Sequence, residues 1–563
     1  MEARSRARRG RISALARFEH TAMIQRQPHN TSPQPLTVGE SYRKAIELLN
    51  AGRLDEARNI CMSIVAVRPK QPDVHSLLGA IAYQNRDGAA AVAHLQKALK
   101  LDPDNLAIRL NLAKTHRDFG QWADAAKVFE TVVKRTPDDS TVLYDLGKAY
   151  GHLDDYAKAA PYYRKALTGT AAPDIVETEL ATALLKLGEF TDAEAHYNAV
   201  LGRTPGFIPA LINLAVLRDI QGRMDDALAL FDTALMHDPN SVEAHFHHAL
   251  ALITRERLAE GWAEYVWRYQ RPKATTLHDR FQIPYWQGEP LENRTFLVWT
   301  EQGLGDEILI ASLVPDVLAQ GARCTLVCTN RLAPLFRRSF PMVRILTRED
   351  MKTDAAASVT ADFQASLSQL ALYLRPTTAS FPKRAGYLKV DTAQTEEIRR
   401  RYKQDSADRL VGIAWHSANP QASGEKSTPL PAWAEILRTP GYRFVSLQYG
   451  EHAHAHKALR DATGLALIVD KSIDPKTDLE SFAAQVAAMD LVISVSNTTV
   501  HVAGALGVPV WTLVPASVGR IWYWFLDRTD SPWYPSMRLF RQQRGIDWSP
   551  TLHAIAQELK QWP

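Results

Sequence analysis

The chain has 563 residues, of which 46% are hydrophobic and 23% charged, and its formal net charge is +4. This length is too great for one hydrophobic core, and the composition is that of an ordinary globular protein, so we expect several domains. So small a net charge argues against a nucleic-acid-binding protein. The sequence contains no run of about 18 apolar residues, so no transmembrane helix is predicted. The three cysteines are too few for a disulfide framework and suit a reducing cytoplasm.

Residues 1–38 are rich first in arginine and then in Gln, Pro, Thr and Ser, with no apolar segment that would serve as a signal peptide. We interpret them as a disordered basic tail. An equally good alternative is an over-extended start, with Met23 as the true initiator.

Three columns of residues return about every 34 positions. They are Ala57, Ala91, Ala125, Ala159, Ala193 and Ala227; Gly79, Ala113, Gly147, Ala181, Ala215 and Ala249; and Pro69, Pro103, Pro137, Pro173, Pro205 and Pro239. This period, with small residues where helices cross, predicts a tetratricopeptide-like array of helix-turn-helix units in which proline stops the second helix. We expect the array over 39–272, ending in an aromatic-rich capping helix. Stacked units of this kind form a superhelix whose concave face binds a polypeptide.

Beyond residue 290, short apolar runs alternate with helical stretches, which predicts two parallel α/β lobes over 290–395 and 408–563. The predicted strands are 295–300, 324–329, 342–346, 386–390, 410–415, 443–447, 466–469, 490–494 and 509–513. The expected fold is therefore an α-solenoid followed by two Rossmann-like lobes.

Two of the predicted strand ends carry polar motifs. Gly303-Leu304-Gly305-Asp306 precedes a helix predicted over 306–320, and its glycines let the backbone approach a ligand. Ser496-Asn497-Thr498-Thr499 precedes a helix predicted over 498–506, whose N-terminus suits a phosphate. Ordinary helix capping is the alternative explanation of both motifs.

With Trp415-His416-Ser417 at another strand end, these motifs resemble the heptosyltransferase-like glycosyltransferases of the GT-B class. The segments 530–535 and 538–542 are similar to the version of this domain that follows tetratricopeptide repeats. That type includes bacterial flagellin glycosyltransferases, and its layout resembles the eukaryotic O-linked N-acetylglucosamine transferase. The resemblance covers about 40–545, but heptosyltransferases carry an acid and a glycine in the element that here reads Ser496-Asn497-Thr498-Thr499, so their donor is not carried over.

The resemblance implies roles for the matching positions. Asp306 is the candidate general base, and His416 is the alternative catalytic residue. The candidate donor ligands are Gly303, Gly305, Lys426, Ser427, Ser496, Asn497, Thr498, Thr499 and His501, with the Lys426 ammonium, the His501 ring and the helix N-terminus on the phosphate. We expect no metal ion, since the two lobes contain no Asp-x-Asp.

One column of the repeats is comparable to the asparagine ladder with which O-linked transferases hold the backbone of their acceptor. It reads Leu77, Asn111, Asp145, Glu179, Asn213 and His247. We take Asn111, Asp145 and Asn213 as candidate acceptor ligands, with a solvated helix face as the alternative.

These features and the resemblance together predict a cytoplasmic protein O-glycosyltransferase that moves a sugar from a nucleotide-sugar to Ser or Thr of a protein held by the repeats. Flagellin is favoured as the acceptor by the resemblance alone. CMP-nonulosonic acid is the first donor to consider, beside UDP-, GDP- and ADP-sugars, and no cofactor is expected. Two alternatives stay open: an enzyme that builds lipopolysaccharide or another glycan, and a repeat scaffold with a degenerate transferase domain.

Overall fold

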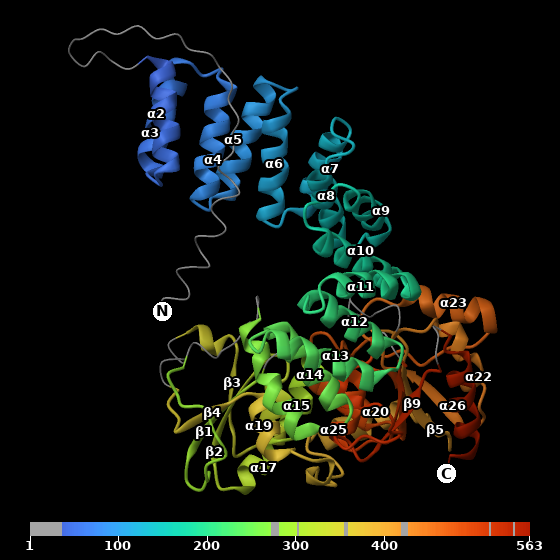
Figure 1. The fold of residues 1–563 in the computed structure, drawn as a ribbon. Helices are drawn as coiled ribbons and strands as arrows, with labels where there is room; N and C mark the ends of the chain where they lie inside the picture. Colours follow the sequence, from blue (N-terminus) through green and yellow to red (C-terminus); the bar gives the residue numbers. More distant parts are fainter. Residues whose placement is uncertain are drawn as a thin grey trace. The chain divides into compact units, whose positions relative to one another are not determined.

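The computed structural model describes residues 37–271, 281–300, 303–353, 359–417, 426–516, 519–543 and 547–562. The tail predicted over 1–38 lies outside these ranges as far as residue 36. The chain divides into two compact units, Met1–Pro205 and Gly206–Pro563, which we describe in turn (Figure 1). Within the described ranges, no helix combines the length and the apolar character needed to cross a bilayer.

The first unit consists of helices joined in pairs, with each pair packed on the next (Figure 1). The helices are α2 (Val38–Asn50), α3 (Leu54–Val67), α4 (Pro72–Gln84), α5 (Gly88–Leu101), α6 (Leu106–Asp118), α7 (Trp122–Val133), α8 (Ser140–His152), α9 (Tyr156–Leu167), α10 (Pro173–Leu187) and α11 (Phe190–Arg203). The alanines of the two small-residue columns are fully buried. A Cβ on Gly79 would lie 2.7 Å from the Leu95 Cγ, so the helices cross too closely for a side chain there. The predicted tetratricopeptide array is confirmed.

The turn within each pair needs one residue with a left-handed backbone. Such residues recur every 34 positions, at Gly52, Arg86, Gly120, Asp154, Gly188, Gly222 and Glu256, with φ between 58° and 81°. Glycine adopts this conformation without a steric penalty, which explains why it occupies most of these turns. The prolines of the column follow the second helix of each pair, as predicted, with one exception. Pro173 does not stop α9; it occupies the first turn of α10, where its missing N–H costs nothing.

The second unit opens with two further pairs, α12 (Ile208–Ile220), α13 (Met224–His237), α14 (Val242–Thr254) and α15 (Leu258–Tyr265), and the 3₁₀ turn η2 (Val266–Gln270). Trp262 of α15 is buried against the α/β part of this unit. Its indole N–H donates to the Arg375 carbonyl at 3.1 Å, and its ring meets Trp522 edge to face at 5.3 Å between centroids. The final repeat therefore shares one hydrophobic core with the lobes.

The first lobe is a parallel sheet of four strands in the order β3-β2-β1-β4. Its elements are β1 (Thr295–Trp299), α16 (Leu304–Ala311), α17 (Val314–Ala319), β2 (Arg323–Cys328), α18 (Ala333–Ser339), β3 (Arg344–Thr347), η4 (Asp350–Lys352), β4 (Phe363–Ala365), α19 (Leu367–Leu374) and η6 (Thr378–Ser380). Two predictions were wrong here. The helix expected over 306–320 is broken into α16 and α17, with Pro315 in the first turn of α17. The strand expected over 386–390 is absent, because the Tyr387 and Leu388 N–H groups both donate to the Ala505 carbonyl.

The second lobe is a parallel sheet of five strands in the order β6-β5-β7-β8-β9. Its elements are α20 (Thr392–Lys403), β5 (Arg409–Ala414), η7 (Leu430–Trp433), α22 (Ala434–Leu437), β6 (Tyr442–Ser446), α23 (Ala453–Thr463), α24 (Leu479–Ala487), β7 (Leu491–Val495), α25 (Thr498–Leu506), β8 (Val510–Val514), η8 (Trp522–Trp524), β9 (Met537–Arg541) and α26 (Ser549–Gln561). The predicted helix 498–506 is confirmed. The strand predicted over 466–469 is reduced to one bridge between Val445 and Ile468, and β9 was not predicted.

The two lobes meet where α16 packs on α25. A Cβ on Gly305 would lie 2.8 Å from the His501 ring, so glycine is needed for this approach. The His501 ring is buried, and its nitrogens lie 2.9 Å from the Tyr534 hydroxyl and 3.2 Å from the Tyr523 hydroxyl. Burial, with the nearby Lys426 charge, lowers the pKa of His501 to about 3, which keeps the ring neutral.

A second contact between the lobes lies at the other end of α25. The backbone around Ala385 and Gly386 crosses Gly507, which ends this helix with φ of 78°. A Cβ on Gly507 would stand 2.1 Å from the Ala385 carbonyl oxygen. Both the backbone conformation and the space therefore require glycine at 507.

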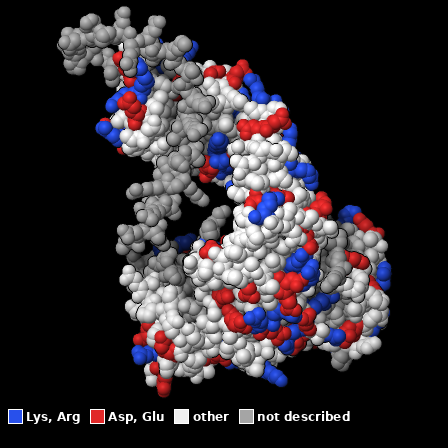
Figure 2. All heavy atoms as spheres, viewed as in Figure 1, with Lys and Arg blue, Asp and Glu red and all other residues white. Residues whose placement is uncertain are grey.

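Charged side chains of both signs are mixed over the described residues on the face shown in Figure 2. Many pair locally, as Arg257 does with Glu260 at 2.6 Å. This face therefore carries no large patch of a single sign among the described residues, in keeping with the small net charge.

We predict that Gly507→Ala lowers the free energy of unfolding of the second unit by clearly more than the roughly 1 kcal/mol that a left-handed backbone alone costs alanine. Gly464→Ala is the matched control, because Gly464 also ends a helix with positive φ and no atom lies within 4 Å of its added Cβ. Calorimetric unfolding of both variants makes the comparison. Equal losses would contradict the close crossing at Gly507.

We predict that His501 makes the protein acid-sensitive. In the folded state its pKa is about 3, below the ordinary value of 6.5 of the unfolded chain, so its stabilisation is present above pH 6.5 and is lost as the pH falls toward 3. Between pH 7.5 and pH 5 this loss amounts to about 2 kcal/mol. His501→Gln should lose that much less stability than the native chain over this interval in denaturant titrations. Parallel losses would show that the ring is not held neutral.

Candidate functional site

The candidate base lies at the start of α16, just beyond β1. Asp306 occupies the first turn of the helix, and its carboxylate accepts a hydrogen bond from the Gly303 N–H at 3.1 Å. This contact is the capping interaction that the alternative explanation expects. Among the described residues, no side chain or backbone group of another residue is seen to donate to the other carboxylate oxygen, so capping and proton abstraction are compatible. Because Gly305 serves the packing of α16 on His501, a donor role for Gly303 and Gly305 stays a prediction.

The electrostatics of Asp306 suit a base that becomes protonated during a reaction. Burial raises the pKa of its carboxyl, and the Gly303 N–H and the charges of Arg268 and Lys426 oppose this rise. Lys426 is itself buried, and its charge also acts on His501. Asp306 of the first lobe and Lys426 of the second lobe thus lie within electrostatic reach of each other.

The turn before α25 is fixed by its own side chains. The Asn497 carboxamide accepts the Thr499 N–H at 2.9 Å and donates to the His416 carbonyl at 3.2 Å. The Ser496 hydroxyl accepts the Trp524 indole N–H at 2.8 Å. Asn497 is therefore the cap of α25, as the capping explanation expects. The buried Thr499 hydroxyl makes no hydrogen bond to any described residue, and Thr498 is half-buried, so these hydroxyls and the helix N-terminus are what the turn offers to an anion.

His501 comes from the same helix but points elsewhere. Both of its ring nitrogens are bonded to tyrosine hydroxyls in the interior between the lobes. A contact between His501 and a donor phosphate stays a prediction, and it would require a tyrosine hydroxyl to move.

His416 and Ser427 are brought together at the end of β5. The Ser427 hydroxyl lies 2.9 Å from the His416 Nδ1 and accepts the Ser417 N–H at 3.1 Å. The Gln448 carboxamide, from the end of β6, accepts the backbone N–H groups of Trp415 and His416 at 2.9 and 2.8 Å. The imidazole is therefore held in place beside the carboxyl ends of two adjacent strands.

Sequence reasoning missed several residues near Asp306 and His416. Arg268 was read only as part of the capping segment, yet its charge acts on Asp306. Sequence reasoning also missed the alternating histidines His452, His454 and His456. Their place after the predicted strand 443–447 could have marked them as candidate site residues. The centroid of the His452 ring lies 5.4 Å from that of the His416 ring. Burial lowers the pKa of His452, a hydrogen bond to the Tyr449 carbonyl opposes this, and the nearby His416, His454 and Lys476 side chains lower it further.

The candidate acceptor ligands are divided between the two units. Asn111 on α6 and Asp145 on α8 belong to the first unit, whereas Asn213 on α12 belongs to the second. Asp145 is buried, and its carboxylate is paired with the Arg117 guanidinium at 2.6 Å. Its part in an acceptor ladder stays a prediction, as does that of the half-buried Asn111.

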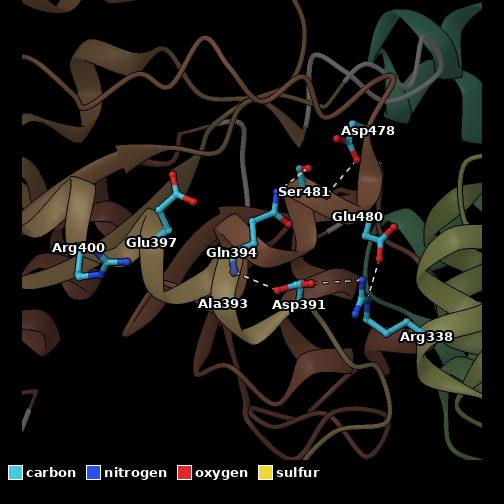
Figure 3. Close-up of a pocket in the computed structure, with 9 residues that line it drawn as sticks. All are labelled: Arg338, Asp391, Ala393, Gln394, Glu397, Arg400, Asp478, Glu480 and Ser481. Carbon is cyan, nitrogen blue, oxygen red and sulfur yellow. Dashed lines mark hydrogen bonds and ion pairs between the residues drawn. The ribbon is translucent and has the colours of Figure 1, made fainter.

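A hollow of about 640 Å³ lies elsewhere, between α18, α20 and α24 (Figure 3). Its lining residues are Arg338, Asp391, Ala393, Gln394, Glu397, Arg400, Asp478, Glu480 and Ser481. Arg338 bonds Glu480 at 2.7 Å and pairs with Asp391 at 3.5 Å, so opposite charges satisfy each other there. None of the predicted site residues lines this hollow, and we do not assign the site to it.

Comparison with protein families finds two kinds of match in this chain. Residues 42–105, 82–148, 140–168, 178–241 and 212–266 match tetratricopeptide repeats, and residues 369–520 match glycosyltransferase family 9 (heptosyltransferase). The latter match includes Lys426 and the turn before α25.

Protein FlbA of Caulobacter vibrioides is 34% identical over 380 residues, which are 63% of this chain and 62% of FlbA. The DnaJ homolog subfamily C member 7 homolog of Schizosaccharomyces pombe is 32% identical over 81 residues, 14% of this chain and 17% of that protein. The chain thus spans less than two thirds of the length of either curated relative. A tetratricopeptide repeat protein from Parabacteroides merdae aligns structurally over 42% of this chain and 94% of its own, at 17% identity and a TM-score of 0.37. The chain combines tetratricopeptide repeats with a glycosyltransferase family 9 domain.

Proposed function

We propose that the protein is a glycosyltransferase that moves a sugar from a nucleotide-sugar to a Ser or Thr hydroxyl of a protein acceptor. The observation that carries the proposal is the meeting of the two lobes: Asp306 at one strand end and Lys426 at the other lie within electrostatic reach. Ligands of open parallel sheets bind outside the carboxyl ends of the strands, which is where both residues and the turn before α25 lie. The match to glycosyltransferase family 9 supports the reaction class.

In this mechanism Asp306 accepts the proton of the acceptor hydroxyl. The oxygen of that hydroxyl attacks the anomeric carbon of the donor sugar at the same time. The bond between that carbon and the phosphate oxygen breaks, and negative charge develops on the departing nucleotide. The Lys426 ammonium and the N-terminus of α25, with the Thr498 and Thr499 hydroxyls, stabilise this charge. His416, whose ring contacts the Ser427 hydroxyl and whose backbone N–H donates to Gln448, contacts the nucleotide in this mechanism.

The acceptor we propose is a protein held by the repeats, with flagellin as the first candidate. Tetratricopeptide arrays present concave surfaces that bind polypeptides, and tethering a polypeptide there raises its concentration at the transferase lobes. The choice of flagellin rests on the resemblance to bacterial flagellin glycosyltransferases; the similarity to FlbA covers part of both proteins. CMP-nonulosonic acid is the first donor to test, and we place the reaction in the cytoplasm.

We predict that one nucleotide among CMP, UDP, GDP and ADP raises the unfolding temperature of the second unit. At about 100 times the dissociation constant, binding adds roughly 2.7 kcal/mol. Lys426→Ala should abolish the shift, whereas Lys560→Ala, on the exposed end of α26, should leave it intact. The readout is the shift caused by ligand, since removal of a buried lysine changes the starting stability as well. Absence of a shift with all four nucleotides would favour the scaffold alternative.

We predict that Asp306→Asn lowers the rate of sugar transfer to flagellin by about 10² to 10⁴-fold, as expected for loss of a general base. The asparagine oxygen still accepts the Gly303 N–H, so the helix cap survives. His416→Gln should cost less than about tenfold. Intact-mass spectrometry of the acceptor, with the nucleotide-sugar identified by binding, gives both rates. A large loss in His416→Gln with little in Asp306→Asn would transfer the role of base to His416.

A further inference from the structure

A small cavity lies where the segment between α19 and α20 meets the second lobe. Its volume is about 20 Å³, which is room for one particle the size of a water molecule. The segment between the two helices supplies Arg375, Phe381 and Arg384, and the second lobe supplies Gly504 of α25 and Trp533. An occupant of this cavity would therefore touch both the connection from the first lobe and the second lobe itself.

Two buried N–H groups of the lining residues lack a hydrogen-bond partner. Arg375 and Trp533 are 3% and 5% exposed, and neither the Arg375 Nε nor the Trp533 Nε1 bonds to any described residue. Both side chains lie against the same Phe381 ring: the Arg375 Cζ is 5.4 Å from its centroid, and the Trp533 ring meets it edge to face at 4.8 Å between centroids. A buried donor without an acceptor is costly, so the cavity favours an occupant that accepts both hydrogens.

The charges around Arg375 favour an anion over a water molecule. Its Nη2 and the Nη2 of Arg384 each bond one carboxylate oxygen of Asp316, and its Nη1 donates to the Leu374 carbonyl at 2.7 Å. Burial lowers the pKa of Arg375, Asp316 opposes this, and the Arg384 charge lowers it further. One carboxylate thus serves two guanidinium groups. The positive charge left over beside the cavity is removed from water, which is costly unless a counter-ion balances it.

We propose that the cavity binds a chloride ion, which accepts hydrogen bonds from the Arg375 Nε and the Trp533 Nε1. Chloride accepts hydrogen bonds and donates none, and its charge balances the second guanidinium. A water molecule would accept the same two bonds but would leave that charge unbalanced. Phosphate and carboxylate groups are too large for a cavity of about 20 Å³. The bound ion would join the segment between α19 and α20 to the second lobe and so stabilise the second unit.

This inference goes beyond the proposed function and does not depend on it, because none of the candidate donor, acceptor or catalytic residues lines the cavity. The direct test is anomalous diffraction from crystals of the full chain soaked in sodium bromide, since bromide replaces chloride and scatters anomalously. We expect an anomalous peak in the cavity, within bonding distance of the Arg375 Nε and the Trp533 Nε1. Density for a water molecule there, without an anomalous peak, would overturn the inference.

The second test measures stability in solution. Chloride should raise the unfolding temperature of the second unit by about 2 °C over gluconate at the same ionic strength, and the rise should saturate as the site fills. Trp533→Phe keeps a ring beside Phe381 but removes the N–H, so it should lose at least half of this rise. Trp286→Phe is the matched control, because Trp286 is equally buried and its indole N–H donates to the Glu289 carbonyl at 2.8 Å.

The control should keep the full rise. The readout is the difference between the two salts within each protein, so a lower starting stability of either variant does not affect it. An equal rise in all three proteins would be a general salt effect and would overturn the inference. A bromide peak without any effect of chloride on stability would mark an adventitious ion only and would overturn it as well. Neither readout involves a nucleotide or a sugar, so either failure leaves the proposed function standing.

Discussion

The close packing of α16 on α25 is the constraint on which the transferase part depends. Gly305 has no side chain, and the His501 ring lies directly against it, neutral and bonded to two tyrosines. This contact sets the first turn of α16 opposite the first turn of α25. Asp306 and the Thr498-Thr499 turn follow from that placement, because each is fixed to its helix by capping interactions. A charged imidazole would break this arrangement.

The same unit ties the last repeats to the transferase lobes through specific contacts. The Trp262 indole donates to the Arg375 carbonyl and meets the Trp522 ring edge to face, and Arg520 pairs with Asp219 of α12. The loop that carries Arg520 leads directly to Tyr523 and Trp524, which bond His501 and Ser496. A continuous chain of contacts therefore runs from α12 to the turn that we propose holds the donor. These contacts join the last two repeats to the proposed donor site within the second unit, and they give Arg520 and Trp522 a role in packing between elements.

The repeat architecture could be predicted almost completely from sequence, because its period fixes both the helix crossings and the left-handed turns. The edge elements could not. β4 has only three residues, and arginines at 538 and 541 interrupt the apolar residues of β9, so neither strand gives a clear apolar run. The segment 386–390 has the composition of a strand, but its Tyr387 and Leu388 N–H groups donate to the Ala505 carbonyl instead of to a neighbouring strand. The strand ends carrying Asp306, His416 and Thr498 were identified, whereas Arg268 and Gln448 were not, since their partners Asp306 and His416 lie far away in the sequence and leave no local pattern.

The central claim is that the two strand ends hold one donor between them. Hydrogen exchange measured with and without the bound nucleotide-sugar tests it most directly, since backbone amides at helix starts exchange readily until a ligand covers them. We predict simultaneous protection of 303–307 and 496–500, with little change in α18, α20 and α24, which line the separate hollow. Protection confined to those three helices, or to only one of the two helix starts, would contradict a shared donor site.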